Sequence, residues 1–148
     1  MKVTKKGQNN IKNKFIHNKN DQKSSKNTEQ IEWFYMSPFE VNAKMIAEYA
    51  EEVNFGETEV WEELDILEII RSDKSNIDFE IVRNNFKDEN DMAFVKKREI
   101  KTIFTVTFSH CTIEDFKPFV QHLFKKWEGV FCADTYDFSP MFEKKDTE

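Results

Sequence analysis

Two stretches of the chain alternate apolar and polar side chains with the period of a β-strand. Between Ile100 and Ser109, β-branched and aromatic residues dominate and every second position is mostly apolar, as in a strand with one buried face. Residues 31–36 form an aromatic run suited to a strand, and Pro38 ends it because proline has no backbone N–H to donate. Both stretches are therefore predicted to be strands.

Shorter strands are expected in three other places. Residues 60–71 carry apolar side chains on both faces, which favours a strand that is buried on both sides, from Asp65 onward. The spacing of Trp61, Leu64 and Glu68 would also fit a helix. A turn-forming cluster at 72–76 leads into a second alternating run at 77–83, so these segments predict a hairpin. Residues 92–97 are expected to add one short, charged strand, and residues 130–138 are expected to form the closing strand.

Two segments place their apolar residues on one stripe at helical spacing. In residues 40–54 the stripe ends at Asn54, a residue type that tolerates the left-handed conformation closing many helices. In residues 116–127 the stripe follows Thr112 and Asp115, which resemble a capping box with Asp in place of Glu or Gln. Both segments are predicted to be amphipathic helices.

In chain order the prediction is strand–helix–strand, one or two inserted strands, and strand–helix–strand again. Packing both helices on one face of an antiparallel sheet buries their two apolar stripes together. The sequence therefore predicts an α+β fold of the ferredoxin-like sandwich type. The inserted strand at 77–83 is expected to extend that sheet or to form its edge.

Charge divides the chain near residue 30. Residues 1–30 hold eight lysines against Asp21 and Glu29, a net charge of +6, whereas the whole chain carries −6. Residues 31–148 must therefore carry −12, from 14 basic and 26 acidic side chains. We expect residues 1–30 to be a flexible basic tail with too few apolar residues to offset the entropy of ordering it; a short turn at 11–16 could still dock. Residues 31–148 are predicted to be a single acidic α+β domain.

Composition excludes several classes of protein. Three glycines are too few for a phosphate-binding loop or a dinucleotide fingerprint, and no run of about 18 apolar residues could span a membrane. The amino terminus has no apolar core, so a secretory signal peptide is not expected. Cys111 and Cys132 form neither a disulfide framework nor a Cys-x-x-Cys pair. The expected location is a reducing cytoplasm, with no membrane partner.

One histidine has neighbours of chemical interest. His110 and Thr112 form a His-x-Thr pair at the end of a predicted strand, which resembles half of the two-histidine phosphoesterase signature. That chemistry needs two such motifs, so that two imidazoles act as acid and base, but the corresponding part of the first unit is Met36-Ser37-Pro38. Thr112 also suits a helix cap. A small phosphodiester- or nucleotide-handling enzyme is therefore the second hypothesis for the function.

Other ligand classes receive little support. The acidic run at 88–91 lacks the glycine and the twelve-residue pattern of a calcium loop, so neither a metal nor a cofactor is predicted. A domain of charge −12 repels phosphates, which disfavours nucleic acid except for weak binding through residues 1–30.

The acidic surface and the aromatic residues carry the main hypothesis. A charge of −12 exceeds what solubility requires in a small domain, and aromatic anchors ringed by carboxylates are typical of recognition surfaces. The sequence predicts a non-enzymatic binding protein of inhibitor, immunity or antagonist type that docks onto a more basic protein. The expected binding surface comprises Trp33, Tyr35, Glu51, Glu52, Glu62, Glu63, Tyr136 and Phe142. A third hypothesis is a structural subunit forming a homodimer through a sheet edge, with residues 77–83 buried.

Overall fold

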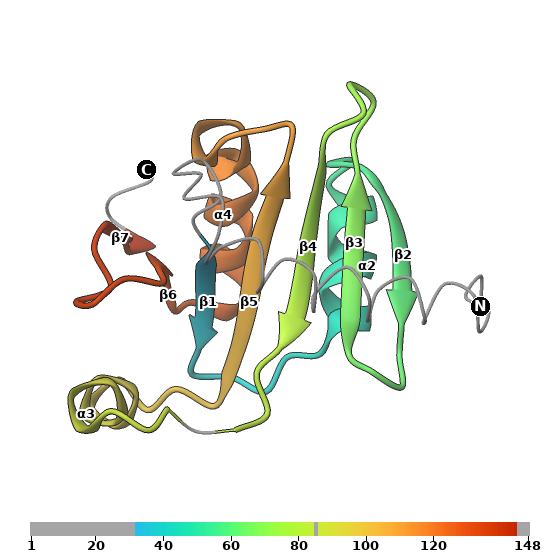
Figure 1. The fold of residues 1–148 in the computed structure, drawn as a ribbon. Coiled ribbons are helices and arrows are strands. Elements are labelled where there is room, and N and C mark those ends of the chain that lie inside the picture. Colours follow the sequence, from blue (N-terminus) through green and yellow to red (C-terminus); the bar gives the residue numbers. More distant parts are fainter. Residues whose placement is uncertain (1–31, 85, 145–148) are drawn as a thin grey trace, which may run out of the picture.

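A computed structural model describes residues 32–84 and 86–144, which build a seven-stranded antiparallel sheet (Figure 1). The predicted basic tail, residues 1–30, lies outside the described residues. The strands are β1 (Trp33–Ser37), β2 (Glu57–Trp61), β3 (Ile66–Ile70), β4 (Asn76–Ile81), β5 (Thr102–Ser109), β6 (Val130–Ala133) and β7 (Met141–Phe142). Across the sheet they follow the order β2-β3-β4-β5-β1-β6-β7.

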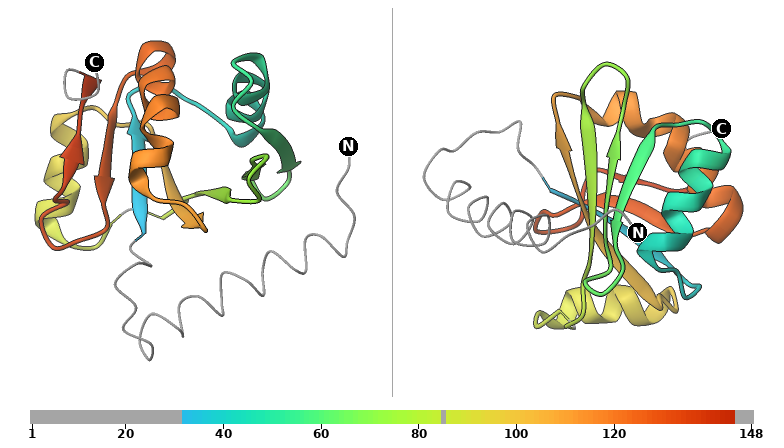
Figure 2. Two further views of the ribbon diagram at one scale, coloured as in Figure 1. Left: turned by 90° about the horizontal axis from the view of Figure 1, so that it is seen from above. Right: turned by 90° about the vertical axis from the view of Figure 1, so that its right-hand side faces the viewer.

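Three helices accompany this sheet in the described part of the chain: α2 (Ala43–Glu52), α3 (Glu89–Lys97) and α4 (Ile113–Trp127). Figure 2 shows α2 and α4 on the same face of the sheet, with α3 crossing the end of the sheet. The prediction of an α+β protein with two helices on one face of an antiparallel sheet is therefore confirmed.

The ends of α2 follow from local chemistry. The side chain of Asn42 accepts a hydrogen bond from the backbone N–H of Met45 at 2.8 Å, which satisfies one of the free donors of the first turn. The carboxylate of Asp65 accepts from the Ala43 N–H at 2.6 Å. Beyond the helix, Asn54 adopts a φ of 58°, the left-handed conformation expected of it.

The ends of α4 also agree with the prediction. The Asp115 carboxylate accepts from the backbone N–H of Thr112 at 3.0 Å, as in a capping box. After the helix, Gly129 has a φ of 100°, and a Cβ at this position would lie only 2.0 Å from the carbonyl oxygen of Met36. Glycine is thus required where the chain turns from α4 against β1.

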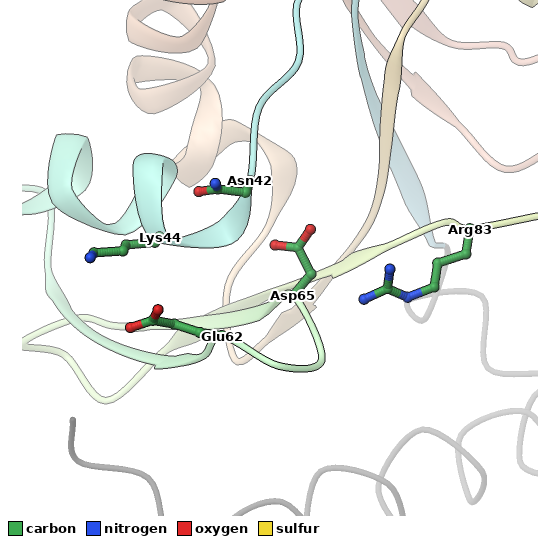
Figure 3. A pocket seen from close by; sticks show the side chains of 5 residues that line it. All are labelled: Asn42, Lys44, Glu62, Asp65 and Arg83. Atoms are coloured by element: carbon green, nitrogen blue, oxygen red, sulfur yellow. The ribbon is translucent and has the colours of Figure 1, made fainter.

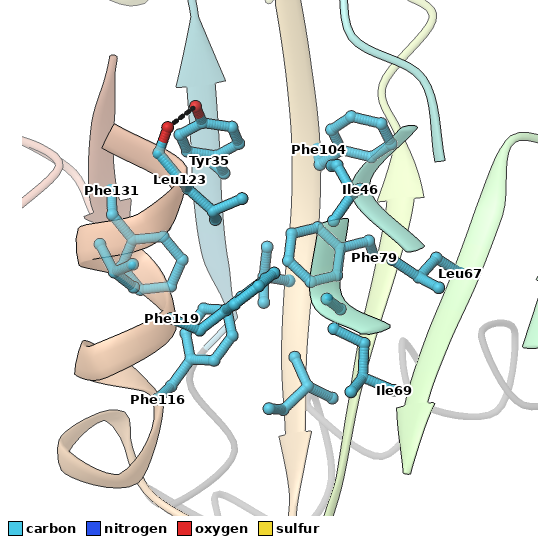
Figure 4. Close-up of a cluster of buried hydrophobic side chains, with 14 of the residues drawn as sticks. Tyr35, Ile46, Leu67, Ile69, Phe79, Phe104, Phe116, Phe119, Leu123 and Phe131 are labelled. Carbon is cyan, nitrogen blue, oxygen red and sulfur yellow. Dashed lines mark hydrogen bonds between the residues drawn. The ribbon is translucent and has the colours of Figure 1, made fainter. Parts of the chain in front are cut away.

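The larger of two main apolar cores lies between the sheet and the helices α2 and α4 (Figure 4). Phe116 of α4 is fully buried there, and its ring centroid lies 5.4 Å from that of Phe131, 5.7 Å from that of Phe119 and 6.0 Å from that of Phe79. Aromatic rings from α4 and from three strands therefore interlock in one cluster. Its labelled members in Figure 4 are Tyr35, Ile46, Leu67, Ile69, Phe79, Phe104, Phe116, Phe119, Leu123 and Phe131.

A second apolar core lies on the opposite face, under β1 and β6. Phe34 and Phe138 are both buried there, with ring centroids 6.0 Å apart. Phe94 of α3 packs against Phe138 at 4.8 Å, so α3 covers this side. Strand β1 is consequently buried on both faces.

One predicted strand is helical in the structure. Residues 92–97 are not a strand but the end of helix α3. The carboxylate of Asp88 caps this helix by accepting from the N–H groups of Asn90 at 2.7 Å and Asp91 at 3.2 Å. Acidic residues in its first turn and lysines in its last turn match the helix dipole.

Of the two placements expected for the strand at 77–83, extending the sheet or forming its edge, the edge position is wrong. The structure places this segment in β4, between β3 and β5, so it does not form an edge of the sheet. The edges are instead β7 and β2, a strand that was not predicted from the sequence, because Glu57 and Glu59 give it few apolar residues. The predicted homodimer through residues 77–83 therefore has no free edge there.

The sheet also differs from the ferredoxin-like expectation in size and connection. It contains more strands than that plan, and the chain leaving α2 enters the sheet at its outer edge as β2 before returning through β3 and β4 to lie beside β5. The closing strand expected over 130–138 is shorter, with β6 ending at Ala133 and β7 pairing back onto it.

Candidate functional site

The aromatic residues of β1 are core residues rather than surface anchors. Trp33 is 6% exposed and Tyr35 is fully buried, so the expectation that one of them faces outward is corrected. The Tyr35 hydroxyl donates a hydrogen bond to the Glu128 carbonyl at 2.7 Å, and burial raises the pKa of this hydroxyl above its ordinary value. Both faces of β1 are covered, which leaves no side of this strand for a partner.

The other two predicted aromatics, Phe142 and Tyr136, are more exposed than Trp33 and Tyr35. Phe142 is half-buried and stacks on Trp33 with ring centroids 6.1 Å apart, while the Lys117 ammonium lies 4.8 Å from the Phe142 ring. Tyr136, in the connection between β6 and β7, is 93% exposed. Among the four predicted aromatics, Tyr136 alone presents its whole side chain to solvent.

The predicted glutamates are exposed, and two of them line one hollow. Glu51 on α2 and Glu62 after β2 belong to a cavity of about 410 Å³, which we call the α2–β2 hollow. The hydroxyl of Thr58 donates to the Glu51 carboxylate at 2.5 Å, which holds that side chain against β2. The full lining of the α2–β2 hollow is Lys44, Ala47, Glu48, Glu51, Thr58, Val60 and Glu62. The hollow therefore holds three carboxylates against one ammonium group.

A neighbouring hollow of about 320 Å³ shares Lys44 and Glu62 with the first (Figure 3). Figure 3 shows Lys44 and Glu62 at one end of it, and the Arg83 side chain reaching toward Asp65 at the other. Asn42 completes the lining. This second hollow has balanced charges, so the acidic character is concentrated in the α2–β2 hollow.

Glu52 and Glu63 do not line the α2–β2 hollow. Both are exposed, Glu52 at the end of α2 and Glu63 in the turn that joins β2 to β3. The structure therefore brings two of the four predicted glutamates into one cavity and places the other two next to them in the chain. Three contributors were missed by the sequence analysis: Lys44, Glu48 and Thr58. Recognition of β2 as a strand would have revealed Thr58, because it alternates with Glu57 and Glu59 and must face α2.

The His110 region shows the geometry of a helix start. His110 is exposed, with a φ of 63°, in the short connection between β5 and α4. Thr112 is the N-cap residue of α4, which accounts for its position. The neighbouring Cys111 is half-buried, and burial raises the pKa of its thiol, which disfavours a thiolate nucleophile. Cys132 lies fully buried in β6, as expected of a small core residue.

Within the described residues, the structure shows no site arranged to hold a cofactor or a metal ion. Among the hollows lined by described residues, three have volumes of about 320 to 410 Å³, and none of these three is lined by a histidine or a cysteine. Within residues 32–84 and 86–144, no group of three or more His, Cys, Asp or Glu side chains is arranged to hold a metal ion. The acidic run at 88–91 is accounted for by the cap and first turn of α3.

Comparison with known proteins identifies no relative. No family model, no curated protein and no solved structure matches the chain. Fold and surface therefore define the class of protein: an α+β protein with a seven-stranded antiparallel sheet and an acidic hollow at one edge. In the part of the chain that the structure describes, none of the helices has the length and apolar character needed to cross a bilayer.

Proposed function

We propose that this chain is a non-enzymatic binding protein of the cytoplasm, of inhibitor or antagonist type, which docks onto a more basic protein through the α2–β2 hollow. The observation that carries the proposal is the convergence of Glu48, Glu51 and Glu62 from two separate elements around one cavity. Glu52 and Glu63 are exposed and follow Glu51 and Glu62 directly in the chain. A basic side chain of a partner would find several carboxylates within one site.

Electrostatic attraction explains why such an arrangement favours recognition. Residues 31–148 carry −12, and a field of this size attracts basic partners and orients them before contact. The hollow adds shape, with Ala47 and Val60 supplying an apolar floor between the carboxylates. Long-range charge would set the association rate, and contacts in the hollow would set the dissociation rate.

The decisive experiment compares two charge-reversal variants of equal net charge. In the first, Glu51, Glu52, Glu62 and Glu63 are replaced by lysine; in the control, exposed glutamates of other elements are replaced. Each set changes the net charge by +8, taking residues 31–148 from −12 to −4. The control set is Glu89, Glu99, Glu114 and Glu128.

The probe is a fluorescently labelled lysine-rich peptide whose association is followed by stopped flow. We expect the first variant to associate about tenfold more slowly than the native chain at low salt, and the control variant to lose much less. Near 0.5 M salt, where the Debye length is about 4 Å, the three proteins should converge. Equal losses in both variants would show that net charge alone acts, and would overturn the assignment to this hollow. Capture from a native lysate with the same three proteins would then identify the partner.

A further inference from the structure

A third hollow lies at the end of the sheet where β2 begins and β3 ends. Its volume is about 410 Å³, and its lining comes from the chain that leaves α2 and from the end of β3. Gly56 lets these two segments approach closely, because a Cβ at this position would lie only 2.9 Å from the carbonyl oxygen of Ile70. Sites for small ligands have volumes of about 300–1,000 Å³, so this hollow has room for a small molecule. We call it the Arg71 hollow.

The side chain of Arg71 is held in place by a stack of aromatic rings. Its guanidinium lies 4.5 Å from the centroid of the Phe55 ring. Phe55 in turn stacks on Phe119, with ring centroids 4.7 Å apart, and Phe119 is fully buried in the larger core. The backbone is fixed as well, because the Arg71 N–H donates to the Ser75 carbonyl at 2.9 Å. The guanidinium is therefore positioned before a ligand arrives, which lowers the entropic cost of binding.

Arg71 has no anionic partner within the described structure. Among residues 32–84 and 86–144, its side chain makes neither a salt bridge nor a hydrogen bond. Asp73, in the turn that follows β3, accepts instead from the Ser75 backbone N–H at 2.9 Å and from the Ser75 hydroxyl at 2.5 Å. A guanidinium presents its N–H donors in a planar fork that matches a carboxylate. The Arg71 hollow therefore offers a bidentate site for a carboxylate.

Glu57 supplies the opposite charge to the same hollow. It is the first residue of β2 and is directly opposite Ile70, the residue before Arg71. Both charged residues therefore lie at one end of the sheet, and both line the hollow. Glu57 is exposed, and within the described residues its side chain makes no salt bridge and no hydrogen bond. Two opposite charges that are not paired with each other can each bind one end of a zwitterion.

The balance of charge selects the class of ligand. Residues 31–148 carry −12, so the surrounding field opposes a simple anion, whereas Arg71 opposes a simple cation. A zwitterion has no net charge and meets neither penalty. Phe55 and Ile70 add apolar contact, and the Ser72 hydroxyl can donate a further hydrogen bond to a carboxylate. A carboxylate, an ammonium group and a small apolar group are together the features of an α-amino acid with an apolar side chain.

We propose that the Arg71 hollow binds a free α-amino acid with an apolar side chain, its carboxylate on the Arg71 guanidinium and its ammonium group on the Glu57 carboxylate. Two solvated ion pairs and a small apolar contact support an affinity in the millimolar range. The proposal is independent of the proposed function, because this hollow shares no lining residue with the α2–β2 hollow.

Titration of the ¹⁵N-labelled full chain with L-leucine, followed through its amide chemical shifts, tests the site directly. We expect saturable shifts at residues 54–57 and 70–72 at millimolar leucine, and none at residues 44–48 of the α2–β2 hollow. Two analogues each remove one charge: N-acetyl-L-leucine has no ammonium group, and L-leucinamide has no carboxylate. Each analogue should bind about tenfold more weakly than leucine, because one charge-assisted contact is lost.

A matched set of variants assigns each charge to its residue. Arg71→Gln should bind L-leucine no better than L-leucinamide, and Glu57→Gln should bind L-leucine no better than N-acetyl-L-leucine. The controls are Arg83→Gln and Glu59→Gln, which remove the same charges from residues outside the hollow and should bind leucine as the native chain does. Urea denaturation checks that each variant is folded. The analogues test the same pairing on the native chain, so the outcome does not depend on any variant.

Three results would overturn the proposal. Absence of shifts at residues 54–57 and 70–72 in millimolar leucine would show that the hollow does not take an apolar amino acid. Equal affinity for L-leucine and N-acetyl-L-leucine would make it a site for a carboxylate alone, in which Glu57 has no part. Equal losses in the variants and in their controls would show that net charge sets the affinity, rather than the two residues of this hollow.

Discussion

Strands β1 and β2 have the same length but opposite environments. All five residues of β1 are buried, whereas β2 runs from an exposed Glu57 to a buried Trp61 with Glu59 and Val60 half-exposed between them. β1 lies between β5 and β6 and has an apolar core on each face. β2 lies at the edge, with α2 on one face only. Position in the sheet thus decides which strand is buried on both faces and which one keeps polar side chains near the surface.

This difference explains where carboxylates are tolerated. A carboxylate on β1 would lose its hydration on either face, at a cost of several kcal/mol unless it were paired. On β2 the same group keeps contact with water or with a cation. The acidic hollow occurs on the β2 side for this reason.

The largest expected effect concerns the core that both helices share with β1. Phe116→Ala removes a fully buried ring that contacts rings from three strands, and should lower the free energy of unfolding by about 3–5 kcal/mol. The matched control is Phe39→Ala, because Phe39 is 48% exposed and should cost much less. Urea denaturation monitored by circular dichroism measures the free energy of unfolding of both variants. A small loss at Phe116 would contradict the packing described here.

The second core should be weaker and more local. Phe138→Ala deletes a ring packed against Phe34 and Phe94, and should cost about 3 kcal/mol, the lower end of the range for such truncations. Hydrogen exchange should accelerate at the amides of α3 while those of α4 stay protected. Equal acceleration in both helices would mean that the two faces of β1 unfold as a single unit.

Tyr35→Phe tests the burial of β1, because the effect of this substitution on stability should depend on pH. Loss of the hydrogen bond to the Glu128 carbonyl should cost about 1–2 kcal/mol near pH 7. Burial raises the pKa of Tyr35 in the folded state, whereas the unfolded value is near 10. The native chain therefore keeps this contribution below about pH 10 and loses it as the pH rises further, because ionisation favours the unfolded state.

Urea denaturation at pH 7 and pH 11 measures this effect. The gap in stability between the native chain and Tyr35→Phe should narrow by about 1 kcal/mol at the higher pH. Tyr136→Phe is the control, because Tyr136 is 93% exposed. The difference in stability between the native chain and this control should be the same at both pH values. A gap that is constant with pH would show that the hydroxyl of Tyr35 ionises freely in the folded protein.

The smallest expected effect shows whether α3 is stabilised by its N-terminal cap or by packing against the rest of the fold. Asp88→Ala removes the cap that accepts from Asn90 and Asp91, and should cost about 1 kcal/mol. Glu89→Ala, one residue further on, is the control and should cost less, because its side chain makes no capping bond in the described structure. Global stability by urea denaturation and hydrogen exchange at residues 89–97 provide the readouts. No change in either would indicate that packing of Phe94 alone holds this helix.

Periodicity alone located the central elements of the fold. β1, α2, β3, β4, β5 and α4 all lie where alternating or helical spacing predicts them, and Asn54 and Thr112 act as the stop and cap signals that they resemble. These elements each bury one or two apolar faces, so their burial is recorded in the spacing of their residues. The acidic character of the domain is likewise a property of the sequence.

Where the elements lie relative to one another was decided only by the tertiary structure. β2 was not predicted, because an edge strand needs few apolar residues and the glutamates of β2 give it the composition of a loop. Trp33 and Tyr35 are buried because β7 and α4 cover their face of β1: Trp33 stacks on Phe142 and Tyr35 packs against Phe124, contacts between residues far apart in the chain. The α2–β2 hollow exists for the same reason. Composition specifies how much acidic surface there is, and long-range packing selects which carboxylates meet.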